Sequence, residues 1–118
     1  MTAYRRIVIE HFRRPRNRGA LPGANRSADG ANPLCGDRIR VQLLVSDGVI
    51  VDARFTADAC ALCIASASLL TEHVRGLTSD DIAVLDAAWI SASLEGEPPP
   101  GRQKCALLPL DTLRRALT

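Results

Sequence analysis

The stretch RIRVQLLVSDGVIVDARF at residues 38–55 decides the fold, because it holds two runs of alternating apolar and polar side chains around an Asp-Gly pair. Alternation with a period of two is typical of strands that bury one face, so the stretch predicts a β-hairpin. A two-residue turn at the Asp-Gly pair would place Leu43 opposite Asp52, which mixes the faces. A three-residue loop at 46–48 instead places Leu43 opposite Val51. We therefore expect the longer loop, with its glycine left-handed in a bulge.

Helices are predicted on the C-terminal side of this hairpin. Residues 60–75 contain no helix breaker and are apolar on most sides, which is typical of a helix buried against a sheet. Thr78 and Asp81 resemble a capping box and predict the start of a further helix. A last helix follows Pro109, which fits its first turn or forces a break just after Cys105. The apolar positions expected on these last two helices are Ile82, Leu85 and Trp89, and then Leu110, Leu113 and Leu117.

The N-terminal part is predicted to supply one helix, a loop and an edge strand. Thr2 can cap the first helix, and Pro15 stops it. Residues 14–34 are rich in Arg, Gly, Asn and Pro, which indicates a loop with one short edge strand near residues 25–31. The expected apolar stripe of the first helix consists of Tyr4, Ile7, Val8, His11 and Phe12.

Length and composition exclude several classes of protein. The 118 residues correspond to one domain over residues 1–118. A hydrophobic content of 47% excludes a disordered chain, and no apolar stretch is long enough to span a membrane. With only four aromatic residues, a stacking platform for single-stranded nucleic acid is not expected. We see no secretory signal and therefore expect a cytoplasmic protein. The few aromatic residues and the lack of a long apolar stretch favour neither a nucleic-acid nor a membrane partner.

Charge is distributed unevenly along the chain. Residues 1–26 carry seven arginines and one glutamate, a net charge of +6, whereas the remainder carries a net charge of −4. Such a run is either a solvated face or a surface that steers an acidic partner protein. Nucleic acid is a weaker option, because the acidic remainder would repel phosphate.

Four cysteines, Cys35, Cys60, Cys63 and Cys105, are the most informative residues. Without an export signal the compartment is expected to be reducing, which favours metal or thiol chemistry over disulfides. Three of them are expected at element ends, where they can converge: Cys35 in the loop before a strand, Cys60 at a helix start, and Cys105 in the loop before the last helix. Asp37 lies two residues after Cys35, so in an extended segment both side chains point the same way.

The types of these residues suit metal binding. Cys60 at a helix N-terminus lies at the positive end of the helix dipole, which favours the thiolate. Lys104 either favours the thiolate of the adjacent Cys105 in the same way or is simply a solvated lysine. Three thiolates and the carboxylate of Asp37 form a four-ligand set, which suits tetrahedral zinc or an iron–sulfur cluster. Spacing alone does not separate these two.

Residues 60–63 also form a C-x-x-C motif, which is found in thioredoxin-like redox pairs. That motif should follow a βαβ pattern near the N-terminus, whereas a β-hairpin precedes it here. We therefore disfavour the redox interpretation. Cys63 is interpreted as a small buried packing residue, with sulfur relay as the minor alternative.

Several long segments follow one another along the chain: PRNRG at 15–19, NPLCGD at 32–37, Cys60 with IASASLLTE at 64–72, KC at 104–105 and LP at 108–109. Together with the opening Tyr4, Ile7, His11 and Phe12, they resemble the iron–sulfur cluster assembly scaffolds, the family of IscU, SufU and the N-terminal domain of NifU. The resemblance covers nearly the whole chain. It implies an α+β fold, with a small antiparallel three-stranded sheet and helices packed on one face.

The resemblance also implies a function. Scaffolds of this family hold a [2Fe-2S] cluster or iron at three cysteines and one aspartate, which correspond here to Cys35, Asp37, Cys60 and Cys105. They accept persulfide sulfur from a cysteine desulfurase, for which Cys105 beside Lys104 is the expected acceptor, and they pass the cluster to recipient apo-proteins. Several members bind Zn²⁺ at the same ligands. In the family, the first helix and the site rim face the desulfurase, which would give the basic segment its partner.

The chain also departs from the family pattern. Cys63 occupies a position that is usually Ala or Ser. Lys104 is found in the SufU branch where the IscU branch has His, but the insertion typical of SufU is missing between Cys60 and Cys105. The segment at 98–102 only partly resembles the Leu-Pro-Pro-Val-Lys segment by which the IscU branch binds its Hsp70 chaperone, which leaves chaperone binding doubtful.

An alternative function uses the same four residues. The chain would then be a zinc-bound sulfur acceptor, a sulfurtransferase that activates a SufS-type cysteine desulfurase. Cys105 would leave the zinc and accept persulfide sulfur. The scaffold interpretation predicts a carrier rather than an enzyme, and the sequence leaves the resting metal open. A third interpretation is a structural zinc domain whose metal never exchanges.

Overall fold

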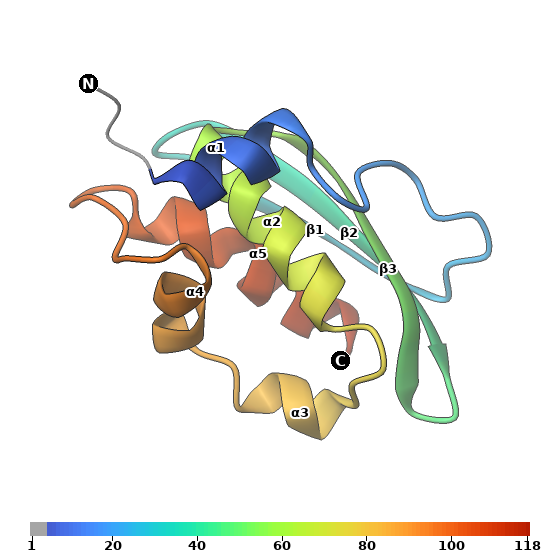
Figure 1. Ribbon diagram of the computed structural model, residues 1–118. Helices are drawn as coiled ribbons and strands as arrows, with labels where there is room; N and C mark the ends of the chain where they lie inside the picture. Colours follow the sequence, from blue (N-terminus) through green and yellow to red (C-terminus); the bar gives the residue numbers. More distant parts are fainter. Residues whose placement is uncertain (1–4) are drawn as a thin grey trace.

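The computed structural model describes residues 5–118 and has an α+β fold (Figure 1). The elements, in chain order, are α1 (Arg6–Arg13), β1 (Arg26–Asn32), β2 (Asp37–Ser46), β3 (Val49–Asp58), α2 (Ala61–His73), α3 (Ser79–Ala83), α4 (Ala87–Ser93) and α5 (Gln103–Ala116). Three antiparallel strands form one sheet in the order β1-β2-β3. This is the fold that the resemblance implied.

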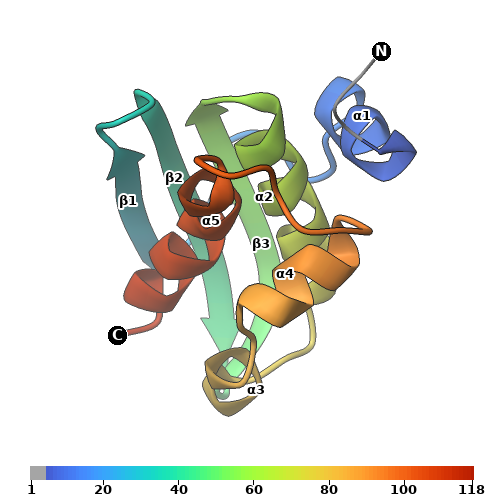
Figure 2. The same ribbon diagram turned by 90° about the vertical axis from the view of Figure 1, so that its left-hand side faces the viewer.

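Helices α2 and α5 cover one face of the sheet, as Figure 2 shows. Ile39, Val41 and Leu43 of β2 point toward these helices and are buried, whereas Arg38 and Arg40 between them are exposed. Helix α2 is buried over most of its surface because it lies between the sheet, α1 and α5. The helices therefore close a single core on one side of the sheet.

The expected three-residue loop of the β2–β3 hairpin is wrong. Ser46 pairs with Val49, so Asp47 and Gly48 form a two-residue turn, and both have positive φ angles of 53° and 77°. Such a pair of angles is typical of the type I′ turn that fits the twist of a hairpin. The bulge exists but lies within β3, where Val51 is skipped between the pairs Val45–Ile50 and Leu44–Asp52.

This bulge changes which side chains of β3 face the core. Ile50 is fully buried, whereas Val51, which the longer loop would have placed opposite Leu43, is 52% exposed. Beyond the bulge, Leu43 faces Ala53 and both are fully buried. One extra residue in β3 therefore gives both strands a continuous apolar face in spite of the short turn.

The N-terminal segment leads from α1 along one edge of the sheet to β1. Val8 and His11 of α1 are buried against α2, but Phe12 is 43% exposed and does not belong to the buried stripe. The predicted Thr2 cap and Tyr4 lie outside the described residues. Arg18 forms a bridge to Phe55 on the free edge of β3, and the edge strand expected near residues 25–31 is present as β1.

Two helices differ from their predictions. Thr78 and Asp81 form the predicted capping box, but the helix ends at Ala83, and Asp86 caps the separate helix α4 by accepting from the Trp89 amide. Ile82 and Leu85 are nevertheless buried. Helix α5 begins before Cys105 and contains Pro109 in its interior, so Cys105 lies in the first turn of a helix and not in a loop.

No helix within residues 5–118 combines the length and the apolar character that crossing a membrane would require.

Candidate functional site

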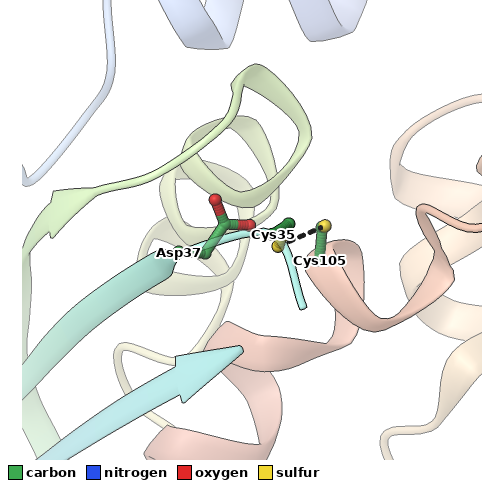
Figure 3. A group of neighbouring side chains, drawn as sticks. All are labelled: Cys35, Asp37 and Cys105. Atoms are coloured by element: carbon green, nitrogen blue, oxygen red, sulfur yellow. Dashed lines mark hydrogen bonds between the residues drawn. The ribbon is translucent and has the colours of Figure 1, made fainter. Parts of the chain in front are cut away.

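Three of the four predicted ligands lie together at one end of the sheet. The ligand atoms of Cys35, Asp37 and Cys105 all lie within 4.8 Å of one another. They come from the turn before β2, the first residue of β2 and the first turn of α5, as Figure 3 shows. The Sγ atoms of Cys35 and Cys105 are 3.3 Å apart. Residues separated by up to 70 positions in the sequence therefore form one cluster of soft and hard donor atoms.

Asp37 is 3% exposed, and its two carboxylate oxygens differ. Oδ1 accepts a hydrogen bond of 2.9 Å from the backbone N–H of Cys60. Oδ2 is buried and has no hydrogen-bond partner within the described part of the chain. Because buried polar atoms are nearly always paired, an unpaired carboxylate oxygen beside two sulfur atoms marks a position where a cation fits.

The surroundings of Asp37 lower its pKa and so favour its charged form. Burial alone would raise this pKa, but the Cys35 thiol and the Cys60 amide favour the carboxylate and hold the pKa below its ordinary value. The carboxylate is therefore ionised at neutral pH and offers a hard anionic ligand to a metal ion.

Cys60 joins the site from the N-terminus of α2. It is the N-cap residue, with an extended backbone, and its own side chain makes no capping hydrogen bond. Its thiol is half-buried and close enough to lower the pKa of Asp37 and raise that of Cys105. Its sulfur is not part of the tight group formed by the other three donors. The structure thus places the fourth predicted ligand beside the group and ties it there through the backbone.

Cys105 and Cys35 differ in exposure. Cys105 is fully buried, and burial, together with the adjoining Cys35 thiol and the Asp37 carboxylate, raises its pKa to about 12. Cys35 lies in an exposed turn that is closed by hydrogen bonds from the Cys35 and Gly36 amides to the Asn32 carbonyl. A sulfur donor that approaches from solution therefore meets Cys35 before Cys105.

Asn32 lies beside the site, although no role was predicted for its side chain. Its side chain is 9% exposed, and its Oδ1 accepts from the Leu34 amide. Its Nδ2 points to the Sγ atom of Cys105 at 3.9 Å. Two signals in the sequence point to Asn32: it begins the NPLCGD segment at 32–37, and it lies directly before Pro33, where side chains of this type often organise turns.

The two remaining residues of interest lie outside the donor group. Cys63 is fully buried in the core, and burial raises its pKa far above the ordinary value, so its thiol is neutral. This agrees with the interpretation of Cys63 as a packing residue. Lys104 is exposed at the start of α5, next to Cys105 in the sequence.

Comparisons with known proteins identify relatives of this chain. The chain is 39% identical over 120 residues to "Iron sulfur cluster assembly protein 1, mitochondrial" of Candida glabrata, with coverage of 97% of this chain and 55% of that protein. It is 35% identical over 119 residues to "Iron-sulfur cluster assembly scaffold protein IscU" of Escherichia coli K12, with coverage of 98% and 91%. It is 37% identical over 75 residues to "Zinc-dependent sulfurtransferase SufU" of Bacillus subtilis, with coverage of 64% and 50%. The chain thus spans about half the length of two of these three relatives.

Solved structures share the same fold. The crystal structure of a protein described as a putative iron-sulfur cluster assembly scaffold for the SUF system, from Fervidobacterium islandicum AW-1, superposes with a TM-score of 0.83 at 25% identity. The superposition covers 98% of this chain and 96% of the Fervidobacterium chain. The family model described as "NifU-like N terminal domain" matches residues 3–118. The chain therefore belongs to the family of NifU-like N-terminal domains.

Proposed function

We propose that this protein is a scaffold on which iron–sulfur clusters are assembled, with Cys35, Asp37, Cys60 and Cys105 as the ligands of a [2Fe-2S] cluster. The sulfur of the cluster would come from a cysteine desulfurase, and the assembled cluster would pass to apo-proteins. The observation that carries the proposal is the convergence of two thiols and one carboxylate within 4.8 Å, with one buried carboxylate oxygen left unpaired. The relatives named as an iron–sulfur cluster assembly protein and as a cluster assembly scaffold protein support the same function.

The ligand types suit a carrier more than a permanent store. Thiolates are soft ligands that bind iron in sulfide-rich sites strongly, whereas a carboxylate is a harder and weaker ligand there. Asp37 would therefore leave one coordination position exchangeable, which eases cluster assembly and release. The exposed turn that carries Cys35 gives iron and recipient proteins access to the same edge of the site.

The basic N-terminal segment supports a protein partner for this scaffold. Six of its seven arginines are exposed and only Arg16 is half-buried, so most of the positive charge faces solvent. Phe12 adds an exposed aromatic ring to α1. A surface of this kind fits an acidic region on a partner, and a cysteine desulfurase is the partner that the proposed chemistry requires.

The test is anaerobic reconstitution of the purified chain with ferrous iron and sodium sulfide. We expect a visible absorption spectrum typical of a [2Fe-2S] cluster, with iron and acid-labile sulfide in equal amounts. Cys35→Ser is expected to lose the chromophore. Cys63→Ala, which changes a cysteine outside the proposed ligand set, is expected to keep it. Failure of the wild-type chain to retain iron would contradict the proposal.

Zinc-dependent sulfur acceptance is the second candidate function, and the spacing of the donors favours it. Zinc bonds of about 2.0–2.3 Å place ligand atoms within roughly 4.6 Å of one another. The spacing in this site is close to that of a single bound ion. The relative named as a zinc-dependent sulfurtransferase supports this candidate. Tight zinc binding with activation of a desulfurase, and no chromophore after reconstitution, would favour it over the scaffold.

A further inference from the structure

Two sulfur atoms of the site lie close enough together for thiol chemistry as well as metal binding. The Sγ atoms of Cys35 and Cys105 are 3.3 Å apart (Figure 3), which is closer than the usual contact distance of about 3.5–4.0 Å between non-bonded heavy atoms. A disulfide bond requires about 2.05 Å, so a shift of roughly 1.3 Å would join them.

We propose that Cys35 and Cys105 act as a dithiol that converts delivered sulfane sulfur into sulfide inside the site. The inference rests on the proposed function, because it supplies the sulfide that a cluster requires. When one thiol of the pair carries a persulfide, the other attacks its inner sulfur. The bond to the outer sulfur breaks, and that sulfur leaves with the electron pair.

The balanced step is Cys–S–SH plus Cys–SH giving Cys–S–S–Cys plus H₂S. The outer sulfur is reduced to sulfide, and the two cysteine sulfurs are oxidised to a disulfide. The proton of the attacking thiol leaves on the hydrogen sulfide. A dithiol reductant of the thioredoxin class then restores both thiols by thiol–disulfide exchange.

The surroundings of the pair suit both halves of this cycle. Cys35 lies in an exposed turn, so sulfur can arrive there and a reductant can attack the disulfide there. The turn is held by backbone hydrogen bonds to Asn32 and contains Gly36 with a positive φ angle of 76° and open space around it. Cys105 is fixed in the first turn of α5, so closure requires movement of the turn rather than of the helix.

The released sulfide would appear beside the two remaining proposed ligands. Asp37 is within 4.8 Å of both sulfurs of the pair, and its carboxylate is held by the Cys60 amide. Iron held there would meet sulfide as it forms. Reduction of the disulfide would then return two thiolate ligands to the same centre.

The experiment uses the full chain without metal, under anaerobic conditions and with a chelator present. The chain is treated with sodium tetrasulfide, desalted and digested, and its peptides are weighed. For wild type we expect a cross-linked pair of peptides containing residues 35 and 105, with little sulfane sulfur on either cysteine. For Cys105→Ser we expect no cross-link and at least about tenfold more persulfide on Cys35, because its resolving partner is missing.

Cys63→Ala is the matched control, because it removes a buried thiol outside the proposed ligand set and leaves the 3.3 Å pair intact, and it is expected to behave like wild type. Persistent persulfides on Cys35 of wild type, or a Cys105→Ser variant that retains no more sulfane sulfur on Cys35 than wild type does, would overturn the inference. Circular dichroism of each variant confirms that it is folded. Because no iron is present, this result is independent of the reconstitution that tests the scaffold function.

Discussion

The backbone N–H of Cys60 donates a 2.9 Å hydrogen bond to Oδ1 of Asp37, which ties the N-terminus of α2 to the first residue of β2. One carboxylate therefore has two tasks in the site. Its Oδ1 atom positions a neighbouring cysteine, and its buried Oδ2 atom remains available for a metal ion. Substitutions that separate these tasks test the proposed chemistry.

Asp37→Cys is expected to give a longer-lived cluster and transfer to an apo-ferredoxin that is several-fold slower. A fourth thiolate is a softer and stronger ligand for iron than a carboxylate, so the exchangeable position is lost. Asp37→Asn is the control, because its amide oxygen can still accept from the Cys60 amide but is a poor ligand. We expect a shorter cluster lifetime in this variant. Transfer from Asp37→Cys as fast as from wild type would contradict the assignment.

Gly30→Ala is expected to destabilise the fold by about 1–3 kcal/mol, as overpacking of a filled interior usually does. Gly30 is buried in β1 beneath α5, and an added Cβ would collide with Oγ1 of Thr112, which is itself buried. Urea unfolding measures the loss. Ser27→Ala, at an exposed position of the same strand, is expected to change stability by less than about 0.5 kcal/mol. Equal stability of Gly30→Ala and wild type would refute the close packing of β1 on α5.

His11 is expected to make the fold sensitive to mild acid. Its Nδ1 lies 2.7 Å from Oγ of Ser68, and burial, followed by the charge of Arg16, lowers its pKa in spite of the opposing charges of Glu72 and Glu10. As the pH falls through about 6.5, the unfolded chain takes up a proton before the folded chain does. The free energy of unfolding should therefore fall from pH 7 toward pH 5 and be independent of His11 above pH 7.

Urea unfolding at several pH values measures this effect in wild type and in His11→Gln. The variant is expected to lose part of the pH dependence. His73→Gln, which removes the other, exposed histidine, serves as the control and should retain it. If the free energy of unfolding falls by the same amount on acidification in His11→Gln and in wild type, His11 is not the cause of the acid sensitivity.

The hairpin shows which part of the fold the sequence could predict. Alternation of apolar residues correctly predicted two strands, and Gly48 has the expected positive φ angle, but the bulge expected at Gly48 lies at Val51. It could not place the bulge, because an extra residue in the turn and an extra residue at Val51 both realign Leu43 with an apolar partner. The short turn is adopted with Asp47 and Gly48 both at positive φ, and the bulge then moves into β3.

The interrupted helix and the position of Cys105 could not be predicted for related reasons. A single apolar face through Ile82, Leu85 and Trp89 fits one helix as well as two short ones, and the cap at Asp86 selects the second arrangement. Pro109 was expected either in the first turn of a helix or at a break just after Cys105. Within α5 its ring nitrogen cannot donate to the Cys105 carbonyl four residues earlier, and the packing of α5 on the sheet and α2 compensates for that loss.

The site was predicted better than its environment. The residue types and the ends of predicted elements indicated Cys35, Asp37 and Cys105, which do converge, because chain ends of packed elements meet at one edge. The difference in burial between Cys35 and Cys105 could not be predicted, since it depends on where the first turn of α5 lies relative to the exposed turn at residues 33–36. The same packing brings Asn32 to the sulfur of Cys105.

X-ray absorption at the zinc edge of the zinc-loaded chain tests most directly whether the four proposed ligands share one inorganic centre. We expect three sulfur ligands and one oxygen ligand around each zinc ion in wild type, and two sulfur ligands in Cys60→Ser. A zinc ion with four sulfur ligands, or one whose sulfur count is unchanged in Cys60→Ser, would contradict the proposed ligand set.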